Sequence, residues 1–140
     1  MQLSDRYLLA AIACALLGMA AGIAMGLTHD FRLSPAHAHL NLLGWVTLAL
    51  YGAYFRAVPR AGLSRAARVQ FWLATIGVAM MAGPLAIALL GHREVEPLIG
   101  IGGFMVTGAM GVFGWIVWRT ARVAAPAKAA ATLPWAGTAR

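Results

Sequence analysis

Four long stretches of the chain contain no Asp, Glu, Lys or Arg, and this constrains the fold more than any other feature. They cover residues 7–27, 36–55, 69–90 and 97–118. A helix needs about 20 apolar residues to cross ~30 Å of hydrocarbon, and each stretch has about that length. The chain is 61% hydrophobic and only 11% charged, far more apolar than an ordinary soluble domain. We therefore predict an all-α integral membrane protein with four transmembrane helices, residues 1–119, and a disordered cytoplasmic tail, residues 120–140.

The net charge of +7 comes mainly from the segments that follow the second and fourth apolar stretches. Their basic residues are Arg56, Arg60, Arg65, Arg68, Arg119, Arg122, Lys128 and Arg140. Basic loops remain on the cytoplasmic side of a membrane, so we predict both termini in the cytoplasm of a bacterial inner membrane. Basic residues beside a bilayer also attract anionic lipid. We therefore expect the lipid bilayer, and no nucleic acid, as the partner of these charges.

The segment SPAHAHLNLLGW, which begins at Ser34, places two histidines at the start of the second apolar stretch. Imidazole is the commonest metal ligand in proteins, and at the edge of hydrocarbon it is costly without a partner. Ser34 as N-cap and Pro35 as first helical residue predict a helix here. Successive helical residues turn by about 100°, so His37 and His39 point to nearly opposite sides. If both are ligands, they serve two different centres.

The four histidines are predicted to form one layer near the outer face of the membrane. His29 follows the first apolar stretch and His92 follows the third, while the other two open the second. Arg32 and Arg93 fall at the same level. Imidazoles in the apolar layer, with guanidinium groups at the interface for two propionates, suit a haem. The chain has no C-x-x-C-H motif, so we expect a b-type haem that is not covalently bound.

Two further residues extend the candidate site along the same helix. Asn41 lies one turn after His37 on the same face, where an amide could hydrogen-bond a ligand. Gly44 is predicted to leave room on that face for a flat group. The candidate cofactor-binding residues are therefore His37, His39, Asn41, Gly44, Arg32 and Arg93. The candidate metal ligands are His37, His39 and His92.

Small and aromatic residues predict how the helices pack. Gly18, Gly22 and Gly26 recur at every fourth position, a spacing that lets helix backbones approach closely in lipid. The fourth stretch is also rich in glycine and is predicted to pack closely against a neighbour. Tyr51, Tyr54 and Phe55 come just before a basic loop, and we expect them in an aromatic belt at the inner interface of the membrane.

The residues HAHLNLLGW resemble a motif of a known family. The spacing His37-x-His39 is similar to the histidine-any-histidine motif in the tenth helix of subunit I of the haem-copper oxygen reductases, and most of all to the C-type oxidases and nitric oxide reductases. In that family the two histidines bind two different haems. Its subunit I has twelve helices in three similar four-helix arcs about a pseudo-threefold axis. The resemblance implies that this chain is one arc and that a homotrimer rebuilds the ring. Each haem would then be held between His37 of one copy and His39 of its neighbour.

The sequence departs from that family in ways that limit the expected activity. It contains no His-His dipeptide for a copper site, and its apolar stretches contain no Asp, Glu or Lys for a proton path. We therefore do not expect oxygen reduction with proton pumping. We expect electron transfer or redox and gas sensing, with a redox protein or a quinone as partner; an enzyme of this type would be a minimal haem oxidoreductase.

Two other interpretations use the same residues differently. The outer histidines together with Met25, Met80 and Met81 would form soft and borderline ligands for copper or another transition metal. Alternatively, the chain is an accessory subunit without a cofactor, in which the histidines form hydrogen bonds that join helices. The three interpretations differ in what the purified protein contains. A haem protein would be coloured, a copper protein would be colourless with stoichiometric metal, and an accessory subunit would have neither colour nor metal.

Overall fold

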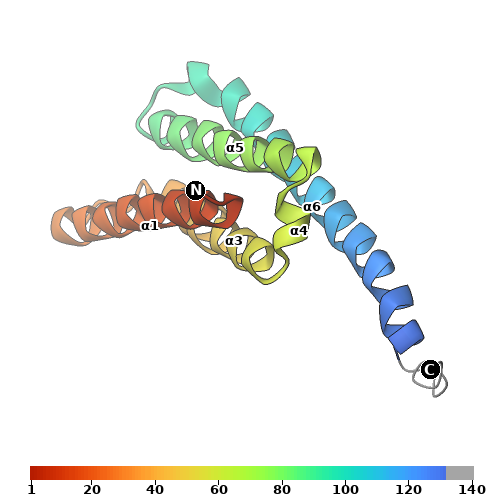
Figure 1. The fold of residues 1–140 in the computed structure, drawn as a ribbon. Helices are drawn as coiled ribbons and strands as arrows, with labels where there is room; N and C mark the ends of the chain where they lie inside the picture. The colour runs from red at the N-terminus through yellow and green to blue at the C-terminus, as the bar shows by residue number, and fades with distance from the viewer. Residues whose placement is uncertain (132–140) are drawn as a thin grey trace, which may run out of the picture.

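A computed structural model describes residues 1–131, with side chains as far as Val123, and every regular element in this range is helical. The elements are α1 Leu3–Thr28, α2 Ser34–His39, the π-helix η1 Leu40–Thr47, α3 Leu48–Ala57, α4 Pro59–Gly62, α5 Arg65–Leu89, the 3-10 helix η2 Arg93–Val95 and α6 Glu96–Ala131 (Figure 1). The all-helical prediction is therefore confirmed for the described residues.

Within the described residues, three helical segments are long and apolar enough to cross a membrane. They are Leu3–Thr28, Arg65–Leu89 and Arg93–Val123. The predicted second stretch is also helical, but it changes from an α-helix to a π-helix and back to an α-helix. There α2, η1 and α3 follow one another without a break from Ser34 to Ala57. Ser34 is itself the first residue of α2, and Leu33 takes the cap position that we predicted for Ser34.

The helices form two antiparallel pairs. The first pair is α1 with the continuous segment α2–η1–α3, and the second is α5 with α6. The pairs meet where α2 and η1 contact α5. Figure 1 shows the two pairs as layers, with α1 and α3 in one and α5 and α6 in the other. In the same view, the second half of α6 extends away from both layers.

Close packing of α6 on α5 depends on Gly102. A Cβ added there would lie 2.6 Å from the amide nitrogen of Met81 and 2.8 Å from the carbonyl oxygen of Gly77. Both are backbone atoms, so only glycine allows this approach. The predicted close packing of the glycine-rich stretch is therefore found at this position. Other glycines of α6 have no described atom within 4 Å of an added Cβ, among them Gly100, Gly103, Gly108, Gly111 and Gly114.

The buried core is aromatic and joins the two helix pairs. Tyr7 of α1 packs against Tyr51, Phe55 and Phe71, with ring centroids 5.7, 5.8 and 4.9 Å apart. Tyr51 is 3% exposed and Phe55 is 2% exposed. Both rings are buried against Tyr7 of α1 and Phe113 of α6, so they do not face outward as the side chains of an aromatic belt would. The hydroxyl of Tyr7 donates a hydrogen bond to Oε1 of buried Gln70.

Helix α6 continues to Ala131, well beyond the predicted end of the fourth apolar stretch. The first part of the predicted tail, from Thr120 to Ala131, is therefore helical. The remainder of that prediction, residues 132–140, lies outside the described residues.

Candidate functional site

Helix α2 places the ring of His37 against α1. The Nδ1 atom of His37 lies 2.9 Å from the carbonyl oxygen of Gly18, and the side chain is partly buried. A carbonyl oxygen can only accept a hydrogen bond, so Nδ1 must carry the proton and donate it. This bond fixes both the orientation and the tautomer of the ring.

Two glycines of α1 make room for this contact. A Cβ at Gly18 would lie 2.5 Å from Nδ2 of Asn41, and a Cβ at Gly22 would lie 3.0 Å from Cε1 of His37. At Gly26 no described atom lies within 4 Å. The predicted glycine face is therefore a helix contact at two of its three positions, and the side chains that it receives belong to the candidate site.

The ring of His39 is held by its own helix. Its Nδ1 lies 2.7 Å from the carbonyl oxygen of Pro35, one turn earlier. By the same reasoning Nδ1 carries the proton here. The two imidazoles are thus oriented by different carbonyl groups, one on α1 and one on α2, and neither ring depends on the other.

These hydrogen bonds leave Nε2 of each neutral ring with a free lone pair. Nδ2 of Asn41 lies 3.5 Å from Nε2 of His37, at the upper limit for a hydrogen bond. That amide nitrogen already donates to the carbonyl oxygen of His37 at 2.9 Å. Nε2 of His39 has no hydrogen-bond partner among residues 1–131. An Nδ1–H bond to a carbonyl is the usual second interaction of a metal-binding histidine, so both Nε2 atoms are suited to bind a metal.

An apolar cavity of about 390 Å³ lies beside His37. Its walls are small and apolar side chains from α1, α2, η1 and α5, including Leu17, Ala36 and Val78. His37 and Thr75 are the residues with polar side-chain nitrogen or oxygen in this lining. A group that entered this cavity would therefore meet hydrocarbon on most sides and an imidazole on one.

The π-helix η1 begins immediately after His39, and sequence reasoning did not predict it. It covers Leu40–Thr47 and contains both Asn41 and Gly44. Extended π segments are rare, and local π turns occur frequently at functional sites. The hydroxyl of Thr47 donates to the carbonyl oxygen of Leu42 at 2.8 Å, but a threonine in a helix is too common to serve as a sequence signal.

Gly44 is buried, and the chain itself fills the space that it leaves. A Cβ there would lie 2.8 Å from Sγ of Cys14 and 3.3 Å from Cγ1 of Val78. The glycine thus allows η1 to pack between α1 and α5 and leaves no room for a flat group. Asn41 lies at a second, smaller cavity of about 280 Å³ that also includes Met19 and Trp45.

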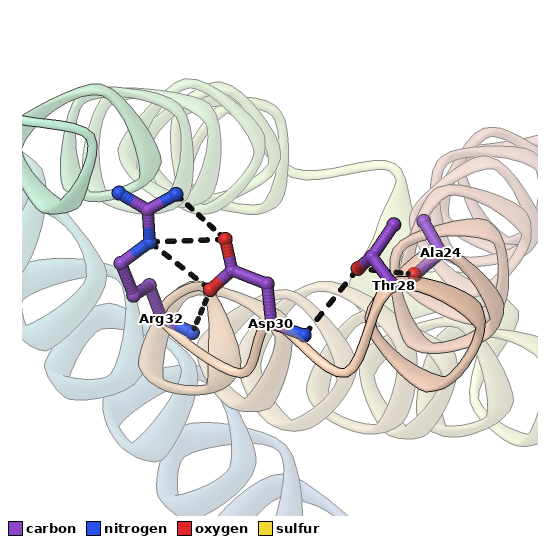
Figure 2. Close-up of polar contacts among 4 residues, drawn as sticks. All are labelled: Ala24, Thr28, Asp30 and Arg32. Carbon is purple, nitrogen blue, oxygen red and sulfur yellow. Dashed lines mark hydrogen bonds and ion pairs between the residues drawn. The ribbon is translucent and has the colours of Figure 1, made fainter.

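Both candidate arginines form ion pairs with neighbouring carboxylates. Nη2 of Arg32 lies 2.6 Å from Oδ2 of Asp30, and Nε donates to the same carboxylate at 3.0 Å (Figure 2). Hydrogen bonds from Arg32 lower the pKa of Asp30 to about 2. Nε of Arg93 donates to Oε1 of Glu96 at 2.7 Å. A propionate at either arginine would therefore have to share the guanidinium group with a carboxylate.

The remaining histidines are not brought together with the central pair. His92 lies in the turn before η2, with Nδ1 3.2 Å from Oε1 of Glu94. His29 caps the end of α1 with a left-handed backbone, φ 53°. Among the residues that the structure describes, no three His, Cys, Asp or Glu side chains form a group that could hold a metal ion. The sulfur of Met25, which the copper interpretation requires, lies 3.9 Å from the hydroxyl of Ser34.

Comparisons of the chain with family models, with curated proteins and with solved structures find no match. The candidate site consists of two imidazoles with fixed tautomers, an apolar cavity beside His37, and a π-helix that begins at the residue after His39.

Proposed function

We propose that this chain is a b-type haem protein of the membrane that transfers electrons, with His37 and His39 as axial ligands. The observation that carries the proposal is that both rings form the same kind of hydrogen bond. Each donates Nδ1–H to a main-chain carbonyl, at 2.9 and 2.7 Å, and each keeps Nε2 for a metal. Such a hydrogen bond also increases the basicity of the ligating nitrogen.

The surroundings of His37 fit a haem better than a bare metal ion. The cavity beside it is apolar, and a porphyrin buries a large apolar surface with its polar groups at one edge. A haem would supply an iron that takes up and releases one electron. The chain would supply the ligand nitrogen, fix its orientation and exclude water from the apolar sides.

The second ligand of each iron is expected from another copy. The two rings are held by carbonyls on different elements, and residues two apart in a helix point in nearly opposite directions, so one chain would offer ligands to two irons. A closed ring of copies satisfies both ligands of every chain, and we propose a homotrimer. The open glycines at Gly100, Gly103, Gly111 and Gly114 support it, because small residues on an exposed helix face favour helix association in lipid.

We further propose that the segment Ser34–Ala57 is a fourth membrane span, since it is unbroken and of about membrane length. Both termini would then lie on the cytoplasmic side, as the basic loops predict. The loop after α1 and the turn before α6 lie at the same end of the bundle in Figure 1, which supports a histidine layer near the outer face. A redox protein or a quinone would exchange electrons there. With both axial positions filled, electron transfer is favoured over gas sensing.

A cofactor-free accessory subunit remains the alternative to test, because histidines that only join helices would form the same two hydrogen bonds. Copper handling is less well supported, since no three His, Cys, Asp or Glu side chains of the described residues form a group that could hold the ion.

An absorption spectrum separates these interpretations. Protein purified in mild detergent from haem-replete cells should show a Soret band that shifts on reduction, and the pyridine derivative should identify haem b. His37→Ala and His39→Ala should each abolish the band while circular dichroism stays unchanged. His92→Ala is the matched control and should retain the band. A colourless wild-type protein, or unchanged bands in both central variants, would disprove the proposal.

A further inference from the structure

A third cavity, of about 880 Å³, lies between the segment that joins α3 to α5 and the second half of α6, and no histidine lines it. Three arginines from three elements line it. Arg60 belongs to α4, Arg65 is the first residue of α5, and Arg119 belongs to α6. Figure 1 shows α4 beside the course of α6, as this lining requires. The haem proposal gives these residues no role.

Among the described residues, no carboxylate forms an ion pair with any of these three guanidinium groups. The lining of the cavity contains no Asp or Glu. In the described part of the chain, the arginines that form ion pairs are Arg32, Arg56 and Arg93, and none of them lines this cavity. Three positive charges around one hollow create a potential that favours an anion. Guanidinium groups bind phosphate oxygens with particular strength because they can donate two parallel hydrogen bonds.

The walls between the arginines are apolar. Val58, Ile116 and Val123 contribute hydrocarbon. Trp115 also lines the cavity, and the guanidinium carbon of Arg119 lies 5.3 Å from its ring centroid. Tryptophan and arginine together are typical of the membrane–water interface, and these residues lie near the end of the candidate span Arg93–Val123. The occupant should therefore have an anionic head and an apolar body.

We propose that this cavity binds an anionic phospholipid, with the phosphate among Arg60, Arg65 and Arg119 and the acyl chains along the apolar wall of α6. Basic pockets between membrane helices are known to suit such head groups. A nucleic acid or a soluble anion would gain nothing from the apolar wall. A bound lipid would also join α4 to α6.

The test uses the full chain in detergent and three probes: dioctanoyl phosphatidylglycerol, dioctanoyl phosphatidylcholine and inorganic phosphate. Binding is measured by native mass spectrometry and by the shift of the thermal unfolding midpoint. We expect the anionic lipid to bind and the zwitterionic lipid to bind at least about tenfold more weakly. Inorganic phosphate at the same concentration should not displace the lipid. Equal binding of the two lipids, or displacement by phosphate, would overturn the proposal.

Matched charge variants locate the site. R65Q/R119Q should weaken binding of the anionic lipid by about tenfold or more, whereas R6Q/R68Q removes the same charge outside the cavity and should change it by less than about twofold. Equal losses in both variants would show a diffuse charge effect and contradict the proposal. If R65Q/R119Q does not fold, R60Q is compared with R6Q on the same criteria.

Discussion

The contact between α5 and α6 at Gly102 allows a stability prediction with an internal control. In Gly102→Ala the new Cβ would lie 2.6 Å from the amide nitrogen of Met81 and 2.8 Å from the carbonyl oxygen of Gly77. Neither backbone atom can move without shifting its helix. Such overpacking costs about 1–3 kcal/mol. Alanine also gains about 1 kcal/mol over glycine from helix propensity, so the net effect must be compared with an alanine that meets no clash.

Gly108→Ala is that comparison, because it lies on the same helix and no described atom falls within 4 Å of its added Cβ. Both variants share the propensity gain, so their difference isolates the clash. We expect Gly102→Ala to be about 1–3 kcal/mol less stable than Gly108→Ala. Unfolding by SDS titration in mixed micelles, followed by circular dichroism, measures the two free energies. Equal stability would show that α5 and α6 are not packed as closely as this structure has them.

Two further predictions concern polar groups. Tyr7→Phe removes the hydroxyl that donates to Oε1 of buried Gln70, whose Nε2 already has no partner among the described residues. We expect the free energy of unfolding to fall by about 1–3 kcal/mol. The double variant Tyr7→Phe with Gln70→Leu, which removes both polar partners, should largely restore it. Asp30, whose pKa is lowered to about 2 by hydrogen bonds from Arg32, should keep its ion pair above the ordinary carboxyl pKa and lose it as the pH falls through about 2. Carbon NMR of the Asp30 carboxyl measures this midpoint, and Arg32→Gln should raise it; a midpoint unchanged by that substitution would contradict the pairing.

Much of the helical architecture could be predicted from the sequence, because hydrocarbon thickness sets the length of a spanning helix. The glycine spacing at Gly18 and Gly22 also predicted a contact face correctly. The identity of the residues that occupy it, His37 and Asn41, depends on the register between two helices, which no single stretch encodes.

Other features lay beyond single-stretch reasoning for the same reason. Tyr51 precedes a basic loop, which suggested the membrane interface, yet it packs on Tyr7 of another helix. Gly44 suggested open space, but Cys14 occupies it from α1. By contrast, the ion pair between Asp30 and its neighbour two residues later is local, and the sequence spacing alone could have indicated it.

Co-assembly of two defective chains tests the central claim most directly. His37→Ala and His39→Ala chains, carrying different tags, are expressed together, and mixed assemblies are isolated by two affinity steps. If each haem is held between His37 of one copy and His39 of the next, every mixed trimer retains one complete site. We therefore expect a Soret band of about one third of the wild-type intensity per trimer, and none from either variant alone. Mixed assemblies without haem, alongside a haem-binding wild type, would contradict ligation between neighbouring copies.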